Sequence, residues 1–183
     1  MNEGLISKRY AKALYDHAYE LGEETVLYHR MQILEAVWRK VPDLRNSLRA
    51  PIPAETKINL LINATGKHPE QSYRDFINLV VANHRTDSIF MITLSYQVVY
   101  RKKKGINVVH LISAKRLPSN ALERIRRFTE EKTHGKVEFS NRIDPSIDGG
   151  FIYQLNDLRI DASVKGQLER ISNHLAKINK SII

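Results

Sequence analysis

The feature of this 183-residue sequence that most constrains its fold is a change of hydrophobic period at Gly105. Before this glycine, apolar residues recur at steps of three and four, which is typical of helices with one buried face. After it, the run from Ile106 to Ile112 is β-branched and alternating, as in a strand. We therefore expect an α+β protein with two domains, a helical bundle at residues 1–104 and a small α/β domain at residues 105–183.

Proline and glycine divide the first part into helical segments joined by short linkers, so neighbouring helices should pack antiparallel. Gly22 suits the C-cap of the first segment, Pro42 ends the second, and Pro53 suits the start of a later one. Thr86 or Asp87 can cap the last segment. The buried stripe predicted for the second segment comprises Leu27, Met31, Leu34, Trp38 and Val41.

In the second part, a helix from Ser119 to about Thr133 should lie between strands, with Leu122, Ile125 and Phe128 facing inward. The residues from Val137 to Ile143 alternate as in a strand with one solvated face. Residues 151–155 and 158–160 should form a hairpin, because Asn156 and Asp157 both tolerate the positive φ of a two-residue turn.

The C-terminal residues carry the most regular apolar stripe of the chain. It comprises Val164, Leu168, Ile171, Leu175, Ile178 and Ile182. The 3.5-residue spacing is that of a coiled-coil seam. The first half of the stripe can equally cover the small sheet, but such a sheet offers no surface for its end. We expect Leu175, Ile178 and Ile182 to bind a helix of another chain.

No catalytic signature is present. The sequence lacks a phosphate-binding glycine loop, a dinucleotide fingerprint and a nucleophile elbow, and it contains no cysteine. Its seven histidines are scattered without metal-ligand spacing. Asp144 and Asp148 flank Pro145, where turn formation is a commoner role for aspartate than acid–base chemistry. We expect neither enzymatic activity nor a bound cofactor or metal.

The net charge of +9 raises a second hypothesis, a basic nucleic-acid-binding module. Residues 1–104 contain 16 basic and 11 acidic residues, and residues 105–183 contain 13 basic and 9 acidic residues. The excess of positive charge is therefore spread along the chain. The one basic run, Arg101 to Lys104, lies where a helix should end and where cations are favourable. An RNA-binding sheet would need exposed aromatic residues, and Phe151 and Tyr153 share a face that can equally pack under a helix.

Several stretches resemble the delta subunit of bacterial rotary ATP synthases, the family of the mitochondrial oligomycin-sensitivity-conferring protein. They are Arg9-Tyr10-Ala11-Lys12-Ala13-Leu14-Tyr15, Ala82-Asn83-His84-Arg85, Ser113-Ala114-Lys115-Arg116-Leu117, and the run from Asp148-Gly149-Gly150 to Leu168-Glu169-Arg170. They follow the family order, and the last is the most specific. The chain departs from the family at two positions: Asn156 and Ala162 stand where the family usually has glycine. Alanine at that position predicts a φ that is not positive.

The resemblance implies a six-helix N-terminal bundle and a non-catalytic place in the peripheral stalk, or stator, at the cytoplasmic face of the bacterial inner membrane. It implies that the bundle binds the N-terminal helix of an alpha subunit of the catalytic head, in a groove between its first and fifth helices. The C-terminal domain would hold the C-terminal ends of the membrane-anchored b subunits. In such a proton-translocating synthase, this subunit only resists torque.

For the groove, we expect one wall from the first helix and one from the fifth. The candidates are Tyr10, Ala13, Leu14 and His17 on the first, and Phe76, Leu79, Val80 and Asn83 on the fifth. Each apolar candidate can equally belong to the core. Tyr10 and Asn83 are the strongest candidates because each keeps a polar end.

Overall fold

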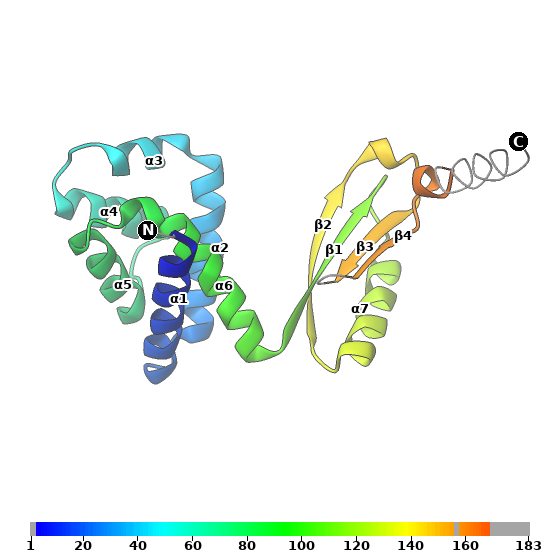
Figure 1. Ribbon diagram of the computed structural model, residues 1–183, viewed down its shortest axis with the longest axis horizontal. Coiled ribbons are helices and arrows are strands. Elements are labelled where there is room, and N and C mark those ends of the chain that lie inside the picture. The colour runs from blue at the N-terminus through cyan, green and yellow to red at the C-terminus, as the bar shows by residue number, and fades with distance from the viewer. Residues whose placement is uncertain (1–2, 156–157, 169–183) are drawn as a thin grey trace, which may run out of the picture. The chain divides into compact units, whose positions relative to one another are not determined.

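The computed structural model describes residues 3–155 and 158–168. The chain divides into two compact units, Met1–Lys104 and Gly105–Ile183 (Figure 1). The division falls at the glycine where the hydrophobic period changes. The described chain is rich in helices and contains one small mixed sheet.

The first unit is helical throughout. Its elements are α1 (Glu3–Glu20), α2 (Glu24–Lys40), α3 (Pro42–Arg49), α4 (Ala54–Ala64), α5 (Gln71–Ala82), the 3-10 turn η1 (Thr86–Ser88) and α6 (Ile89–Lys104). Thr86 and Asp87 thus lie in a 3-10 turn that leads into α6. Gly22 ends α1 as predicted, with φ of 70°, while the amides of Gly22 and Glu23 bond back to Tyr19 and Ala18.

The core of this unit is formed by apolar stripes and tyrosines whose hydroxyls are bonded. The predicted stripe of α2 is confirmed at Leu27, Met31, Leu34 and Trp38, which are all buried. Val41 is an exception and is 42% exposed, because α2 ends at Lys40. The hydroxyl of Tyr73 donates to the carbonyl of Leu61 at 3.0 Å, and burial raises the pKa of Tyr73 to about 12.

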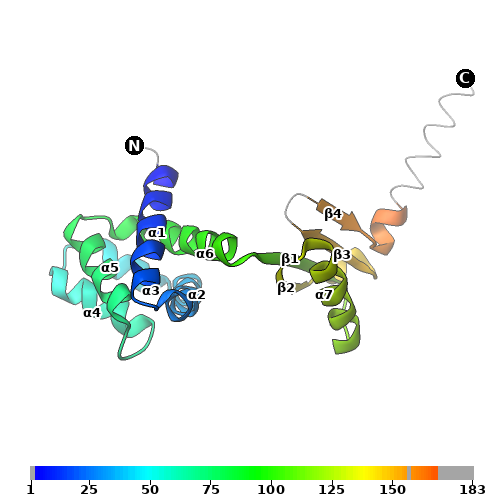
Figure 2. The ribbon, with the colours of Figure 1, turned by 90° about the horizontal axis from the view of Figure 1, so that it is seen from below.

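The second unit is a four-stranded sheet with one helix along a face (Figures 1 and 2). Its elements are β1 (Ile106–Ser113), α7 (Ser119–Thr133), β2 (Lys136–Ile143), the 3-10 turn η2 (Pro145–Ile147), β3 (Phe151–Leu155) and β4 (Leu158–Asp161). The strand order is β2-β1-β3-β4. β1 and β2 are parallel and joined through α7, whereas the β1–β3 and β3–β4 pairs are antiparallel. The turn predicted at Asn156 and Asp157 lies outside the described residues.

The core of the second unit lies between the sheet and α7. Four buried residues form it: Val109, Leu111, Val137 and Tyr153. Leu122 and Ile125 of α7 pack on them as predicted. Phe128, also predicted to face inward, is 56% exposed. The buried position of that turn is taken by Thr129, whose hydroxyl lies 3.0 Å from that of Tyr153.

Two further expectations concern backbone conformation. Ala162, the alanine that replaces a family glycine, is not among the residues with positive φ. Asp144 forms a turn as predicted, since its carboxylate accepts from the amide and the hydroxyl of Ser146 at 3.1 and 2.6 Å. These hydrogen bonds lower the pKa of Asp144.

Candidate protein-binding surface

Helices α1 and α5 lie side by side and antiparallel, and two polar contacts join them. The amide nitrogen of Asn83 donates to the hydroxyl of Tyr10 at 3.1 Å. About two turns further along, His17 Nε2 lies 3.0 Å from Asp75 Oδ2. Both contacts are partly exposed, so the line between them runs along the surface of the unit.

An apolar strip lies between the two polar contacts. Leu79 is one turn from both Asp75 and Asn83 on the same side of α5, and it is 52% exposed. Ala13 occupies the corresponding place on α1 and is also exposed. We call the surface formed by Tyr10, Ala13, His17, Asp75, Leu79 and Asn83 the α1–α5 seam. The small alanine side chain lets another helix approach, and Leu79 offers it an apolar contact.

The structure separates the predicted groove residues into two groups. Tyr10, Ala13, His17, Leu79 and Asn83 are exposed or half-buried at the seam. The other three, Leu14, Phe76 and Val80, are 6%, 3% and 0% exposed. They belong to the core because each follows a seam residue in sequence (Ala13, Asp75 or Leu79) but lies on the buried face of its helix. They support the seam from below.

The N-terminus of α5 is held by a carboxylate from the loop between α1 and α2. Glu23 accepts from the backbone amide of Ser72 at 2.8 Å and from that of Gln71 at 3.3 Å. These amides are helix-start donors without a partner inside the helix. Burial raises the pKa of Glu23, but the hydrogen bonds from Ser72 and Gln71 outweigh it, so this pKa lies below its usual value. Glu23 thereby fixes α5 to the end of α1.

A second anchor holds the chain just before α5. The guanidinium of Arg30 in α2 makes a two-pronged ion pair with Glu70, in which Nη2 donates to Oε1 at 2.9 Å. The same guanidinium donates to the carbonyl of Thr65 at 3.0 Å and lies over the ring of Tyr73. Burial raises the pKa of Glu70, but the hydrogen bonds from Arg30 outweigh it and the pKa is lowered.

The far end of α5 is fixed by its backbone. The amides of His84 and Arg85 bond back to the carbonyls of Val81 and Val80, and His84 takes a left-handed φ of 53°. This places Asn83 at the C-cap, directly after the last helical residue Ala82, with its side chain towards Tyr10. The Asn-His-Arg stretch quoted above therefore ends α5 and positions one member of the seam.

Sequence reasoning missed two residues of this site. Asp75 is the partner of His17, and its spacing of four from Leu79 was a signal that it shares a helix face. Glu23 carried no such signal, because its bonds to Ser72 and Gln71 join residues 48 and 49 positions apart.

The second unit has its own apolar surface, a groove of about 700 Å³ between α7 and the β3–β4 edge. Phe128 of α7, Phe151 of β3 and Ile160 of β4 are among its lining residues. The first two members of the C-terminal stripe, Val164 and Leu168, are exposed. Leu175, Ile178 and Ile182 lie outside the described residues.

The described residues contain no group of histidine and acidic side chains that is arranged to hold a metal ion. Over the same part of the chain, no helix is both long and apolar enough to cross a membrane. Tyr153 is buried against Thr129, so β3 does not present Phe151 and Tyr153 as a pair of exposed aromatics for stacking bases. The sheet thus gives no support to the nucleic-acid hypothesis.

Comparison with known proteins points to one family. Residues 6–175 match the family described as ATP synthase delta (OSCP) subunit. A protein of Phocaeicola vulgatus called ATP synthase subunit delta is 39% identical over 183 residues, covering 98% of each chain. A protein of the same name from Bacteroides fragilis is 38% identical and covers 100% of both. A chain in the cryo-EM structure of the Toxoplasma gondii mitochondrial ATP synthase hexamer shares the fold, with a TM-score of 0.71, 17% identity and coverage of 96% of this chain and 98% of that one.

Proposed function

This chain belongs to the ATP synthase delta (OSCP) subunit family, and we propose that it binds the catalytic head through the α1–α5 seam and the stalk through its second unit. As a member of this family it is a peripheral-stalk connector, or stator subunit, of ATP synthase and not an enzyme. It is a peripheral component of that membrane complex. Because the two delta subunits named above come from bacteria, we propose that it lies at the cytoplasmic face of the inner membrane.

One observation carries the proposal for the head. Leu79, an exposed apolar side chain, lies between two polar contacts that join α1 to α5. An amphipathic helix can lay its apolar stripe along such a seam, with polar residues at both ends to fix its position. We propose that the guest is the N-terminal helix of an alpha subunit, bound across the first and fifth helices of the family's six-helix bundle.

The partly exposed polar groups of the seam explain how a guest helix is oriented. Tyr10 keeps a large apolar ring with a hydroxyl at its end, a combination that is frequent at binding hot spots. His17 and Asp75 form the opposite end, and each of their side chains is 43% exposed. A guest that places a cation near Asp75 and an apolar residue at Leu79 would satisfy this end and the apolar middle of the seam.

The second unit supplies a separate surface, as a connector under torque requires. We propose that the C-terminal ends of the b subunits bind the C-terminal stripe, including Leu175, Ile178 and Ile182. The exposure of Val164 and Leu168 supports this proposal, because these residues begin the same stripe. Truncation of the chain after Leu175 should weaken binding of a b-subunit fragment more than it lowers stability. Equal binding by both forms would contradict the stalk proposal.

The head proposal is tested by calorimetric titration of the full chain with a synthetic alpha-subunit N-terminal peptide. Leu79→Arg should weaken binding by at least about tenfold, because the charged group replaces an apolar contact. Val26→Arg is the matched control, since Val26 is 51% exposed on α2 and outside the seam. Unchanged affinity in Leu79→Arg, or equal loss in both variants, would remove the seam as the binding site.

A further inference from the structure

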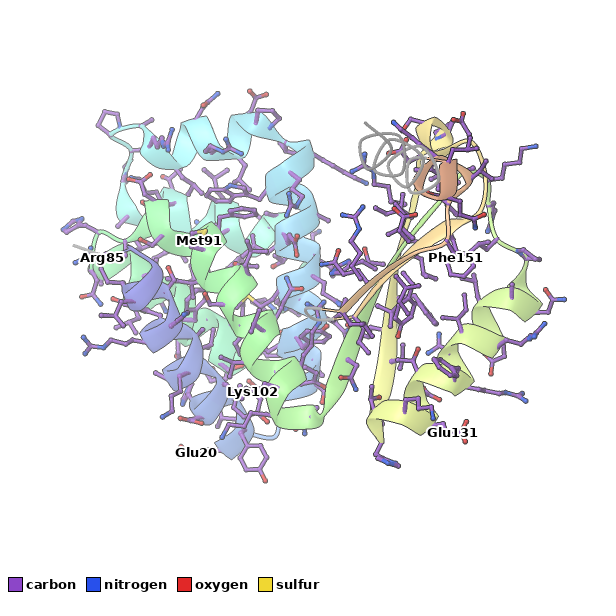
Figure 3. All side chains as sticks on the ribbon, turned by 45° about the vertical axis from the view of Figure 1, so that its right-hand side comes forward. Glu20, Arg85, Met91, Lys102, Glu131 and Phe151 are labelled. Carbon is purple, nitrogen blue, oxygen red and sulfur yellow. The ribbon has the colours of Figure 1, made fainter. Side chains whose placement is uncertain are left out.

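Helix α1 has a second exposed edge, which faces α6 instead of α5. A groove of about 800 Å³ lies there, lined by Lys8 and Lys12 of α1 and by Leu94, Ser95, Val98, Val99, Lys102 and Lys103 of α6. Figure 3 shows the two helices side by side, with Lys102 labelled on α6. The floor is apolar, and Val98 within it is 63% exposed.

Lysines stand on both walls of this groove, and its lining contains no carboxylate. Lys8 and Lys12 are one helical turn apart on the first wall, while Lys102 and Lys103 stand on the second. Within the described residues, none of these four lysines forms an ion pair. The ammonium group of Lys103 lies over the ring of Tyr15, 5.7 Å from its centroid, which is a cation–π contact and not an ion pair.

The basic run at the end of α6 thus has two roles. Lys104 donates to Glu24 at 2.9 Å, and Arg101 donates to the hydroxyl of Tyr28 at 2.8 Å, so both hold α6 to α2. Lys102 and Lys103 line the groove instead. Favourable placement at a helix C-terminus accounts for the run as a whole. It does not account for a matching pair of lysines on α1.

We propose that the α1–α6 groove binds an amphipathic helix of a partner protein that carries carboxylates on both sides of an apolar stripe. The apolar floor favours a side-chain stripe over phosphate groups, which would leave Leu94 and Val98 without contacts. Lysines on both walls favour acidic residues along both flanks of the guest. The α6 lining spans Leu94 to Lys103, about 14 Å of helix axis, which corresponds to roughly 10 residues of guest.

The test uses the full chain and a labelled synthetic peptide of about 14 residues. The peptide has leucines at helical spacing and glutamates on both flanks, and its control replaces the glutamates with glutamines. Fluorescence anisotropy should show that the Lys8→Glu/Lys12→Glu variant binds the acidic peptide about tenfold more weakly than the unmodified chain. The glutamine peptide should bind weakly to both.

A charge-matched variant, Lys40→Glu/Lys67→Glu, reverses two exposed lysines outside the groove and should keep most of the affinity. An equal loss in both variants would overturn the proposal, because net charge alone would then explain binding. Loss of peptide binding in Leu79→Arg would overturn it too, by placing the acidic helix on the α1–α5 seam. Lysine-dependent binding of phosphatidylglycerol vesicles or single-stranded RNA, without binding of the peptide, would equally reject it.

The outcome is separable from that of the head proposal. Lys8→Glu/Lys12→Glu should leave binding of the alpha-subunit peptide within about twofold, because both lysines lie on the far edge of α1 from Leu79. Methyl chemical-shift changes at Val98 and Val99 on addition of the acidic peptide would locate it in the groove. Shifts confined to Leu79 would contradict the assignment.

Discussion

The two units of this chain bury their apolar residues to different extents. The helical unit contains large side chains from several helices that are almost completely buried, among them Tyr28, Tyr73 and Tyr96. In the second unit, four buried residues form the core cluster, and the aromatic Phe128 of its one long described helix is exposed. The first unit buries its core completely and can bind a guest helix at its surface, along the α1–α5 seam. The second unit leaves apolar side chains exposed beside its small sheet, and helices of a partner can bury them.

The difference predicts that stability in the first unit is concentrated in a few long-range contacts. Arg30 is the clearest case, since its guanidinium joins α2 to Glu70 and to Thr65. Arg30→Met should destabilise this unit by about 3–5 kcal/mol, because it leaves the Glu70 carboxylate buried without its partner. The single tryptophan, Trp38, lies in α2, so chemical denaturation followed by its fluorescence reports this unit.

The exposed pair of Arg39 and Glu35 provides the control, with Arg39 61% exposed. Arg39→Met should cost less than about 1 kcal/mol. If both arginine variants lose the same stability, the buried ion pair does not set the first unit apart.

In the second unit, a core substitution should act locally and less strongly. Leu111 is buried at the centre of the small core, and Leu111→Ala should cost about 2–3 kcal/mol, the lower part of the usual range, because half-buried neighbours can relax. Amide hydrogen exchange should show loss of protection in β1 and β3 with the helical unit unchanged. A matching shift of the Trp38 transition would mean that the two units do not unfold separately.

Acid should destabilise the helical unit. The pKa values of Glu23 and Glu70 are lowered by hydrogen bonds that outweigh burial, and that of Glu24 is lowered by its hydrogen bond from Lys104. A carboxyl group whose pKa is lower in the folded state contributes stability above its unfolded pKa of about 4.3, and this is lost as pH falls through the folded pKa. The Trp38-detected midpoint should therefore fall as pH decreases below about 5.

Glu70→Gln tests the origin of this dependence. The variant should be less stable at neutral pH but should show a flatter pH profile, because one of the shifted carboxyl groups is gone. A profile as steep as that of the unmodified chain would assign the pH dependence to other groups.

The smallest expected effect concerns the seam itself. Asn83→Ala removes an exposed hydrogen bond to Tyr10 and should cost about 0.5 kcal/mol or less of folding stability. Affinity for the alpha-subunit peptide should fall several-fold, since the end of the seam loses its polar contact. A large loss of stability without loss of affinity would show that Asn83 serves the fold and not the guest.

Local patterns predicted the elements of the fold well because helix stops and period changes are encoded in neighbouring residues. Gly22 ends α1 as its type indicates, whereas the left-handed residue that ends α7 is His134, with φ of 50°, and not the glycine that follows it. The division of groove candidates could not be predicted in the same way. Leu14 and Ala13 are adjacent in sequence, yet one is in the core and the other at the seam, and only the position of α5 decides which.

Polar contacts between residues far apart in the sequence could not be predicted either. Glu23 stabilises the start of α5 from a loop 48 residues earlier, and no periodic pattern in the sequence predicts this contact. Phe128 looked like a core residue by its type and spacing, but Thr129 takes the buried place because its hydroxyl meets that of Tyr153. Hydrophobic spacing therefore predicts which stripe a helix buries more reliably than which residue at its margin is buried.

The division of binding between the two units is tested most directly by site-specific crosslinking in the assembled synthase. The chain has no cysteine, so single cysteines can be introduced at Leu79, at Val26 and at Phe128 and labelled with a photoreactive group. A label at Leu79 should crosslink to an alpha subunit, one at Phe128 to the stalk, and one at Val26 to neither. A Leu79 label that reaches only the b subunits, or a Val26 label that captures the alpha subunit instead, would contradict this division.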